Sequence, residues 1–308
     1  MLKAYSDMGT DYLDSGVIDK VIFDRESMLI SEFAVSNPTP KEKVACIFCG
    51  SETNWFDMVD EVYYQRCSNC LSIFAFIKNE ITDKYKSYQP LIDFRMSEEF
   101  QTSAAQRRAG IWNDLLFWLE FRLARYLAKS SGLDVIDIDN HYNEFAKRIK
   151  NAGFCGSYNE AKTADVVLFF DKFRRLAEPV KTLSQLRCQL KDNGLLVMNL
   201  RVGSGFDVLT LKGCRDILTP YEVICLPSIE GLEIILDKAG FEILETSSTG
   251  TLDVRYVQQN MELVDESNLF ARYLINKTDK SSLADFQRFL QKSGMSSHAR
   301  VIARKRPV

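Results

Sequence analysis

The sequence lacks several features that mark common classes of protein. Its most apolar segment, residues 111–128, is interrupted by Asp114, Glu120, Arg122 and Arg125, so we expect no membrane span. The N-terminus has no apolar core of the kind a signal peptide needs, which favours a cytoplasmic location. The formal net charge is only -3, with a pI near 5.7, so the charge balance does not predict a nucleic-acid partner or an anionic membrane surface.

Histidine is also scarce, because the chain has only His141 and His298. His141 lies in a polar stretch after an apolar run, where it has two interpretations. It could contact a ligand or accept a proton, or it could stand there because its backbone tolerates loop conformations. The sequence assigns it no partner, which favours the second interpretation.

Cysteine carries the most specific motif in the chain. Two CxxC pairs, "CIFCG" and "CSNC", place Cys46, Cys49, Cys67 and Cys70 on two tight turns. Four thiolates at this spacing suit a tetrahedral Zn²⁺ site, and the aromatic spacer between them suits a small β-ribbon around the metal. Four unrelated core thiols are the alternative, which the paired spacing disfavours. The sequence therefore predicts a zinc ribbon over residues 43–80.

The charge of this ribbon bears on its role. Its acidic side chains outnumber its basic ones: Glu52, Asp57, Asp60, Glu61 and Glu80 against Lys43, Arg66 and Lys78. A surface of this sign disfavours the tracking of phosphates. We therefore expect a structural arm and no nucleic-acid partner.

The remaining chain divides into three further parts. Residues 1–42 form a leader of mixed polarity, and residues 81–132 form a helical linker whose apolar end, 111–128, is typical of a helix buried between two layers. Residues 133–308 alternate strands and helices, which predicts a doubly wound α/β domain. The expected strands are 134–138, 164–170, 195–202, 241–248 and 298–305, and the expected helices are 143–153, 178–194, 228–240 and 282–294.

The second half of this α/β domain resembles a known family. The stretches "ADVVLFFDKFRRLAEPVKTLSQLRCQLKDNGLLVMNLR", "LPSIEGLEIILDKAGFEILET" and "HARVIARK", with the preceding ribbon, resemble class I S-adenosylmethionine-dependent methyltransferases with an N-terminal ribbon. The resemblance covers residues 133–305. It implies a Rossmann-like methyltransferase sheet closed by an antiparallel strand. It also implies methyl transfer from S-adenosylmethionine to a small-molecule or glycan-type substrate.

The cofactor loop departs from the family pattern. In that family a D-x-G-x-G-x-G motif follows the first strand, and here its acidic position is Asp137. The three glycine positions fall on Asp139, His141 and Asn143. These residues tolerate left-handed backbone, but each adds a side chain where the cofactor would approach. They argue against ordinary S-adenosylmethionine binding, although their polar groups could contact a ligand instead.

Two further positions differ from the family. The acid expected after the second strand, 153–158, is replaced by Tyr158, and the chain from there to Ala164 is too short for the usual helix and third strand. The Glu-His pair that many relatives carry after the fourth strand reads Arg174 and Arg175, which excludes a histidine base there. Asp171, just before them, completes the cofactor-binding residues that the resemblance implies.

A glycine-flanked loop follows the expected strand 195–202. Open α/β sheets bind ligands at the carboxyl ends of strands, which makes this loop a candidate substrate site with Arg201 as the contact for an anion. A tight turn with a salt bridge is the alternative. The candidate substrate residues are Arg201, Ser204, Asp207, Tyr221 and Glu222.

Two functions remain open from the sequence. One is a methyltransferase, in which Asp171, Tyr221 or Glu222 could serve as base, although no catalytic residue can be assigned. The other is a catalytically inactive pseudo-methyltransferase that serves as a binding or scaffold protein. The family resemblance favours methyl transfer.

Overall fold

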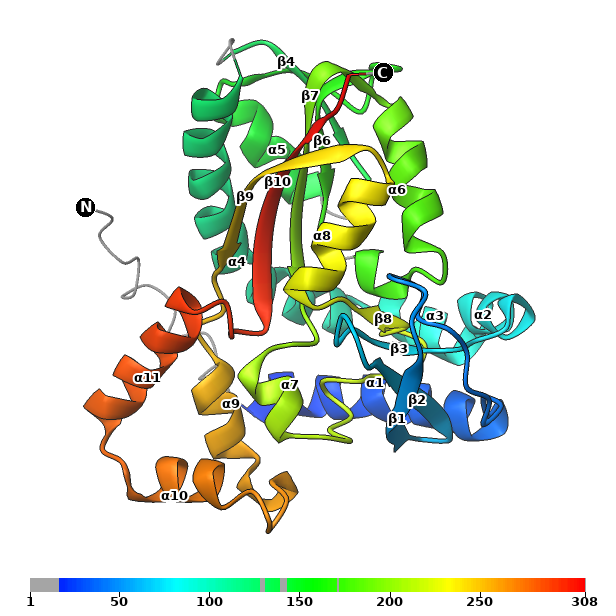
Figure 1. Ribbon diagram of the computed structural model, residues 1–308. Helices are drawn as coiled ribbons and strands as arrows, with labels where there is room; N and C mark the ends of the chain where they lie inside the picture. The colour runs from blue at the N-terminus through cyan, green and yellow to red at the C-terminus, as the bar shows by residue number, and fades with distance from the viewer. Residues whose placement is uncertain (1–16, 128–130, 139–142, 171, 308) are drawn as a thin grey trace.

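The computed structural model describes residues 17–127, 131–138, 143–170 and 172–307. Its strands form a sheet of six, ordered β5-β4-β6-β7-β10-β9, and a sheet of four, ordered β1-β2-β3-β8 (Figure 1). Three residues singled out in the sequence, Asp139, His141 and Asp171, lie outside the described residues. The strands of the larger sheet are β4 (Leu133–Asp137), β5 (Cys155–Tyr158), β6 (Ala164–Phe169), β7 (Leu190–Arg201), β9 (Phe241–Ser248) and β10 (His298–Lys305).

The larger sheet is parallel from β5 to β7. Its last two strands are β10, which runs antiparallel to both of its neighbours, and β9 at the edge. β4 pairs in parallel with β5 and β6, β6 pairs in parallel with β7, and β10 lies antiparallel between β7 and β9. The interior of β6, from Val166 to Phe169, is buried throughout, as expected for a parallel strand covered on both faces. The predicted doubly wound, Rossmann-like α/β sheet with a closing antiparallel strand is confirmed.

Helices cover both faces of this sheet. α4 (Glu98–Tyr126) and α5 (Asn143–Asn151) lie on one face, and α6 (Pro179–Cys188) and α8 (Ile229–Lys238) lie on the other (Figure 1). α4 buries Leu115, Leu119 and Leu123 against the strands, whereas Phe117 and Phe121 are 55% and 63% exposed on its outer face. The prediction that this helix is buried between two layers was therefore wrong. Its apolar residues extend beyond the stripe that the sheet covers.

The boundary between α6 and β7 also differs from the prediction. The helix expected over 178–194 ends at Cys188, and β7 already begins at Leu190. Gly194 is not a helix stop but the site of an irregularity in the strand, where the β6 pairing changes register between Ala164 and Val166. A Cβ on Gly194 would lie 2.9 Å from the carbonyl oxygen of Lys191, which explains the glycine.

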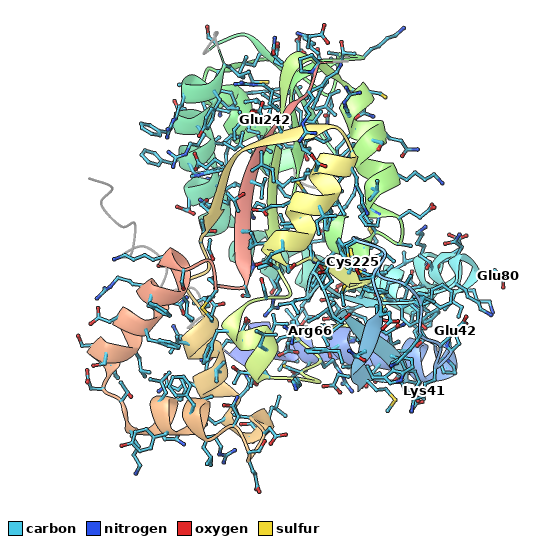
Figure 2. The ribbon with its side chains drawn as sticks, in the orientation of Figure 1. Lys41, Glu42, Arg66, Glu80, Cys225 and Glu242 are labelled. Atoms are coloured by element: carbon cyan, nitrogen blue, oxygen red, sulfur yellow. The ribbon has the colours of Figure 1, made fainter. Side chains whose placement is uncertain are left out.

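The smaller sheet joins the cysteine module to the α/β domain. β1 (Thr53–Val59), β2 (Val62–Cys67) and β3 (Ile73–Ala75) form the ribbon, and β3 then pairs with the short strand β8 (Cys225–Leu226). Figure 2 places Cys225 where the two parts meet, far from Glu242 at the other end of the larger sheet. The ribbon is thus continuous with a strand that follows it by about 150 residues.

The carboxyl ends of β4, β6 and β7 all face this lower half of the molecule (Figure 1). A second hydrophobic core there combines the ribbon, the N-terminal helices and the C-terminal helical insertion. Within the described ranges, no helix is long and apolar enough to cross a membrane. The helices of this half are α1 (Val17–Ser36), α2 (Asn79–Lys86), α3 (Gln89–Met96), α7 (Phe206–Thr210), α9 (Asp253–Gln259), α10 (Leu269–Lys277) and α11 (Lys280–Lys292).

Candidate functional site

The four cysteines of the ribbon converge on one point. Their sulfur atoms all lie within 4.8 Å of one another, with Cys46 and Cys70 at 3.6 Å and Cys49 and Cys67 at 3.3 Å. Sulfurs bound tetrahedrally to Zn²⁺ at about 2.3 Å lie about 3.8 Å apart, so the observed spacing fits that ion. The predicted clustering of the four thiols is confirmed, and their chemistry suits zinc.

The turns that hold these thiols also suit a metal site. The backbone N–H groups of Phe48 and Asn69 point at the sulfurs of Cys46 and Cys67 at 3.4 and 3.3 Å, which stabilises thiolate charge. Gly50 follows the first CxxC pair, and Leu71 follows the second. Although it is not a glycine, Leu71 adopts the same left-handed conformation, with φ 62°.

The site is anchored to the α/β domain. The Ser228 backbone N–H donates to Ser72 Oγ at 3.0 Å, and the Ser228 hydroxyl donates to the Cys70 carbonyl. On the other side, Lys238 Nζ donates to the Phe48 carbonyl at 2.9 Å. Ser228 is also the N-cap of α8, so the metal turns and this helix are fixed together.

The ends of β4 and β5 bring two predicted cofactor residues together. The Tyr158 hydroxyl donates to Asp137 Oδ2 at 2.5 Å, and the Asp137 backbone N–H donates to Asn159 Oδ1 at 2.7 Å. Asn143, the third glycine position of the family loop, begins α5. A buried carboxylate and a phenol at this edge can contact the polar groups of a nucleoside.

The chain beyond β5 is as short as the sequence predicted. β6 begins at Ala164, and residues 159–163 form neither a helix nor a strand. β5 is therefore the edge of the larger sheet. The exposed Glu160, whose carboxylate lies 3.9 Å from Lys150 Nζ, is the first carboxylate after β5. This edge of the sheet is thus shorter than in the family that the sequence resembles, and Glu160 follows it.

A basic turn follows β6. The 3-10 helix η1 (Lys172–Arg175) is pinned by the fully buried Phe173, and the Ile224 backbone N–H donates to the Arg174 carbonyl at 2.7 Å. Lys172 Nζ reaches the Ile138 carbonyl, at the end of β4, at 2.6 Å. Arg174 and Arg175 are thereby held at the carboxyl end of β6.

Glu222 is the centre of a buried ionic cluster. It accepts from the Tyr85 hydroxyl at 2.6 Å and from Arg95 Nη2 at 3.0 Å, and it pairs with Arg175. Burial alone would raise the pKa of this carboxyl, but Arg175 and Arg95 outweigh burial and lower the pKa to about 2. Glu222 is therefore ionised and fully engaged near neutral pH, which removes it as a general base.

Tyr221, the neighbouring candidate, is a packing residue. Only 3% of its surface is exposed, its ring stacks on Tyr85 at 5.3 Å, and its hydroxyl donates to the Asn37 carbonyl. Burial raises its pKa to about 12. The prediction of Tyr221 as a substrate residue does not suit this placement, because a tertiary contact with the end of α1 takes its hydroxyl.

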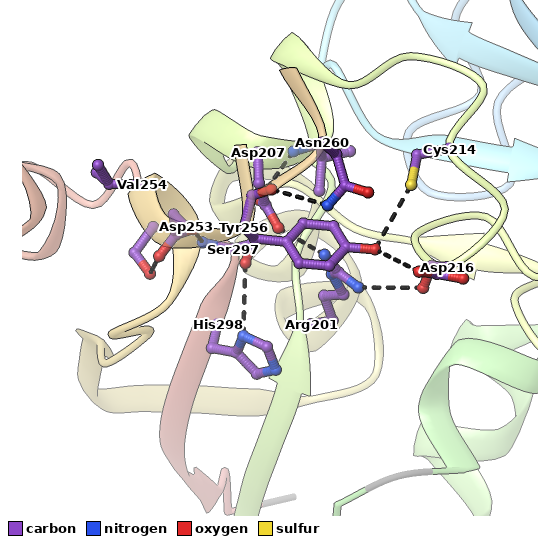
Figure 3. A network of polar contacts seen from close by, with 12 residues as sticks. Arg201, Asp207, Cys214, Asp216, Asp253, Val254, Tyr256, Asn260, Ser297 and His298 are labelled. Carbon is purple, nitrogen blue, oxygen red and sulfur yellow. Dashed lines mark hydrogen bonds and ion pairs between the residues drawn. The ribbon is translucent and has the colours of Figure 1, made fainter. Parts of the chain in front are cut away.

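The loop after β7 brings Arg201 and Asp207 together. Arg201 Nη2 donates to Asp207 Oδ2 at 2.5 Å, and burial raises the pKa of Asp207 while Arg201 opposes that shift. Figure 3 shows this pair beside Asp216 and Tyr256, whose hydroxyl donates to Asp216 Oδ2 at 2.9 Å. Ser204 Oγ and Arg201 Nε, both buried, have no hydrogen-bond partner among the described residues.

His298 is a candidate site residue that was not singled out from the sequence. It opens β10 and pairs in register with Arg201, so its exposed side chain lies at the carboxyl edge of the sheet. The preceding residue, Ser297, is fixed by its backbone N–H to Asp253 Oδ1 at 2.6 Å, and its hydroxyl lies 3.5 Å from His298 Nδ1 (Figure 3). One feature of the sequence could have indicated it, because the expected last strand, 298–305, begins with one of the two histidines of the chain.

Comparison with known proteins finds one partial similarity in sequence. No family model matches the chain. It is similar to the tRNA U34 carboxymethyltransferase of Aeromonas hydrophila, with 29% identity over 134 residues, which is 41% of this chain and 34% of that protein. The chain thus spans about a third of the curated relative it matches.

Similar solved structures include two methyltransferase structures. Phosphoethanolamine N-methyltransferase 2 of Haemonchus contortus has 14% identity and a TM-score of 0.47, over 97% of this chain and 76% of that one. A methyltransferase in complex with the Trm112 activator from Haloferax volcanii has 14% identity and a TM-score of 0.43, over 68% of this chain and 96% of the other. By its own strand order the chain has the Rossmann-like fold expected from the sequence, and the solved structures similar to it include S-adenosylmethionine-dependent methyltransferases.

Proposed function

We propose that this protein is an S-adenosylmethionine-dependent methyltransferase of the cytoplasm that acts on a small-molecule or glycan-type substrate. The observation that carries the proposal is the sheet itself, in which antiparallel β10 closes a parallel sheet between β7 and β9. Polar side chains gather at the edge where such sheets bind ligands. The partial similarity to a carboxymethyltransferase agrees with transfer of a small alkyl group to an acceptor.

The residues at that edge have different roles in this proposal, some as contacts of the cofactor and one as a base. Asp137 and Tyr158, joined at 2.5 Å, would hold the polar groups of S-adenosylmethionine, and Asn143, at the start of α5, and Glu160, after β5, are the further candidates. S-adenosylmethionine supplies an electrophilic methyl group on sulfur. Acceptance of that methyl by a hydroxyl or amine releases a proton, and an imidazole suits its removal. Because Glu222 and Tyr221 are engaged elsewhere, His298 replaces them as the candidate base.

Zinc has a structural role in this proposal. All four protein ligands are cysteines, which leaves no open position for a substrate. The ion would instead hold β3 against β8, and β8 leads back to the segment that carries Glu222. The ribbon then supports the substrate side of the site without taking part in chemistry.

The test is calorimetric titration of the zinc-loaded protein with S-adenosylmethionine and with S-adenosylhomocysteine. We expect micromolar binding, weakened about tenfold by Tyr158→Phe, because the hydroxyl that positions Asp137 is lost. Tyr126→Phe is the matched control, since that phenol also donates to a carboxylate, Glu245 Oε2, at 2.9 Å but lies at the opposite side of the sheet.

The same titration separates the proposal from its alternative. An inactive pseudo-methyltransferase is favoured by the short wall after β5 and by the Asp137–Tyr158 bond, which occupies two cofactor residues with each other. Absence of heat with both ligands, in folded protein that retains its zinc, would favour that binding or scaffold role. Equal loss of affinity in both tyrosine variants would show that the cofactor lies elsewhere.

A further inference from the structure

Arg174 is held in an unusual state for a half-buried arginine. Its Nε atom is buried and has no hydrogen-bond partner, and within the described part of the chain its guanidinium makes no hydrogen bond or ion pair. An arginine side chain has five N–H donors in a fixed fork, and leaving buried donors unused is unfavourable. An arginine in this state indicates a missing acceptor.

The surrounding charges do not supply that acceptor. Among the described residues, the cluster around Glu222 contains the guanidinium groups of Arg95, Arg174 and Arg175 but only two carboxylates, Glu26 and Glu222. Arg95 engages both carboxylates, at 2.7 Å to Glu26 and 3.0 Å to Glu222. Arg175 takes the other oxygen of Glu222. Arg174 attracts Glu222 from a distance but does not reach it, so the cluster retains one uncompensated positive charge.

The position of this charge matches a ligand site. η1 follows β6 directly, at the carboxyl edge of the parallel strands, and Ile224 and Phe173 fix its backbone. Arg175 is 41% exposed on the same turn, so it can share a ligand with Arg174 while remaining paired with Glu222. Two guanidinium groups on one rigid turn suit the planar or tetrahedral oxygens of carboxylate and phosphate.

We propose that Arg174 and Arg175 bind an anionic group, a phosphate or a carboxylate, carried by the methyl acceptor. The site differs from the sequence-based expectation, which placed the anion contact at Arg201. Arg201 already has a buried counter-ion in Asp207 at 2.5 Å, whereas no carboxylate of the described residues forms an ion pair with Arg174. Calling the ligand an acceptor rests on the proposed function, but the anion site itself does not.

The experiment titrates the zinc-loaded protein with inorganic phosphate, and separately with acetate, at constant ionic strength. We expect saturable binding of at least one anion, weakened at least about tenfold by Arg174→Gln. Arg288→Gln is the matched control, because Arg288 is similarly half-buried, at 42% side-chain exposure, but pairs only with Asp285 on α11. The stronger of the two anions identifies the acceptor group as phosphate or carboxylate.

Unfolding measurements on the same variants test a purely structural role. In the described part of the chain the Arg174 guanidinium makes no hydrogen bond or ion pair, so Arg174→Gln removes no such contact and should unfold no earlier than the parent protein in anion-free buffer. Phosphate should raise the midpoint of the parent but not of the variant. A variant that is destabilised, yet binds both anions like the parent, would overturn the proposal.

Two other outcomes are informative. Competition by a single-stranded RNA, with a steep loss of affinity as salt rises, would replace the small acceptor with a nucleic-acid backbone and overturn the proposal. Anion binding that depends on Arg174, in a protein that does not bind S-adenosylmethionine, would overturn the proposed function and leave the anion site standing. The two failures are therefore distinguishable.

Discussion

Replacement of Glu222 by glutamine is the sharpest test of the buried cluster. The substitution keeps the size of the side chain and removes its charge. Arg95 and Arg175 would then face a neutral amide, although Tyr85 could still donate to its oxygen. Removing one partner of a buried ion pair leaves the other charge uncompensated, which is the most destabilising way to change such a pair.

The expected magnitude follows from the pKa of Glu222. Burial would raise this pKa, but Arg175 and Arg95 lower it from 4.5 to about 2. A shift of that size corresponds to about 3 kcal/mol of stability. Because the folded pKa lies below the unfolded value, this stabilisation is present above pH 4.5 and is lost as the pH falls towards 2. Arg175 is 41% exposed, so solvent screening favours the lower end of the usual range for buried pairs.

The assay is urea unfolding of the parent and Glu222→Gln proteins, both zinc-loaded, at several pH values between 7 and 3. We expect a difference of about 3 kcal/mol at pH 7 that shrinks steadily below pH 4.5, since protonation of the parent then mimics the variant. Glu178→Gln is the control, because its exposed pair with Lys181 should be worth less than about 0.5 kcal/mol.

Two results would refute the reasoning. A difference below about 1 kcal/mol at pH 7 would mean that the three partners do not hold the carboxylate in its charged form. A large difference that does not change between pH 7 and pH 3 would mean that the loss comes from packing and not from charge.

Three further predictions concern the contacts that support the site. Removal of zinc by a strong chelator should lower the melting temperature and speed hydrogen exchange at Cys225, because the metal supplies folding energy to a ribbon that shares β8. Gly205→Ala should lower the unfolding free energy by about 3 kcal/mol, since its Cβ would lie 2.4 Å from the Cα of Ser297; a loss below about 1 kcal/mol in urea would contradict this. Asp253→Asn should lower it by about 2 kcal/mol and reduce any methyl transfer, because an amide NH2 would replace Oδ2, which accepts from Gln287 Nε2 and Ser296 Oγ next to Ser297, and unchanged unfolding would exclude that role.

Several parts of this protein were predictable because their signals are local. The four cysteines assemble as their two pairs indicated, since a CxxC turn sets two thiols close together regardless of the rest of the fold. The alternation of apolar runs and amphipathic segments predicted the larger sheet and its order along the chain. The short stretch between Tyr158 and Ala164 excluded a helix there on length alone.

Other parts were decided by contacts between distant segments. Glu222 and Tyr221 sit in a stretch with the composition of a substrate loop, but partners from α1, α2, α3 and η1 place them in the interior. Contacts between distant segments also decide the pairing of β3 with β8 and the register that sets His298 beside Arg201. The sequence alone determined which elements form, since hydrophobic period and turn residues act over a few positions. Only the tertiary structure decided which arginine keeps a partner and which does not, because that depends on which charges distant segments bring together.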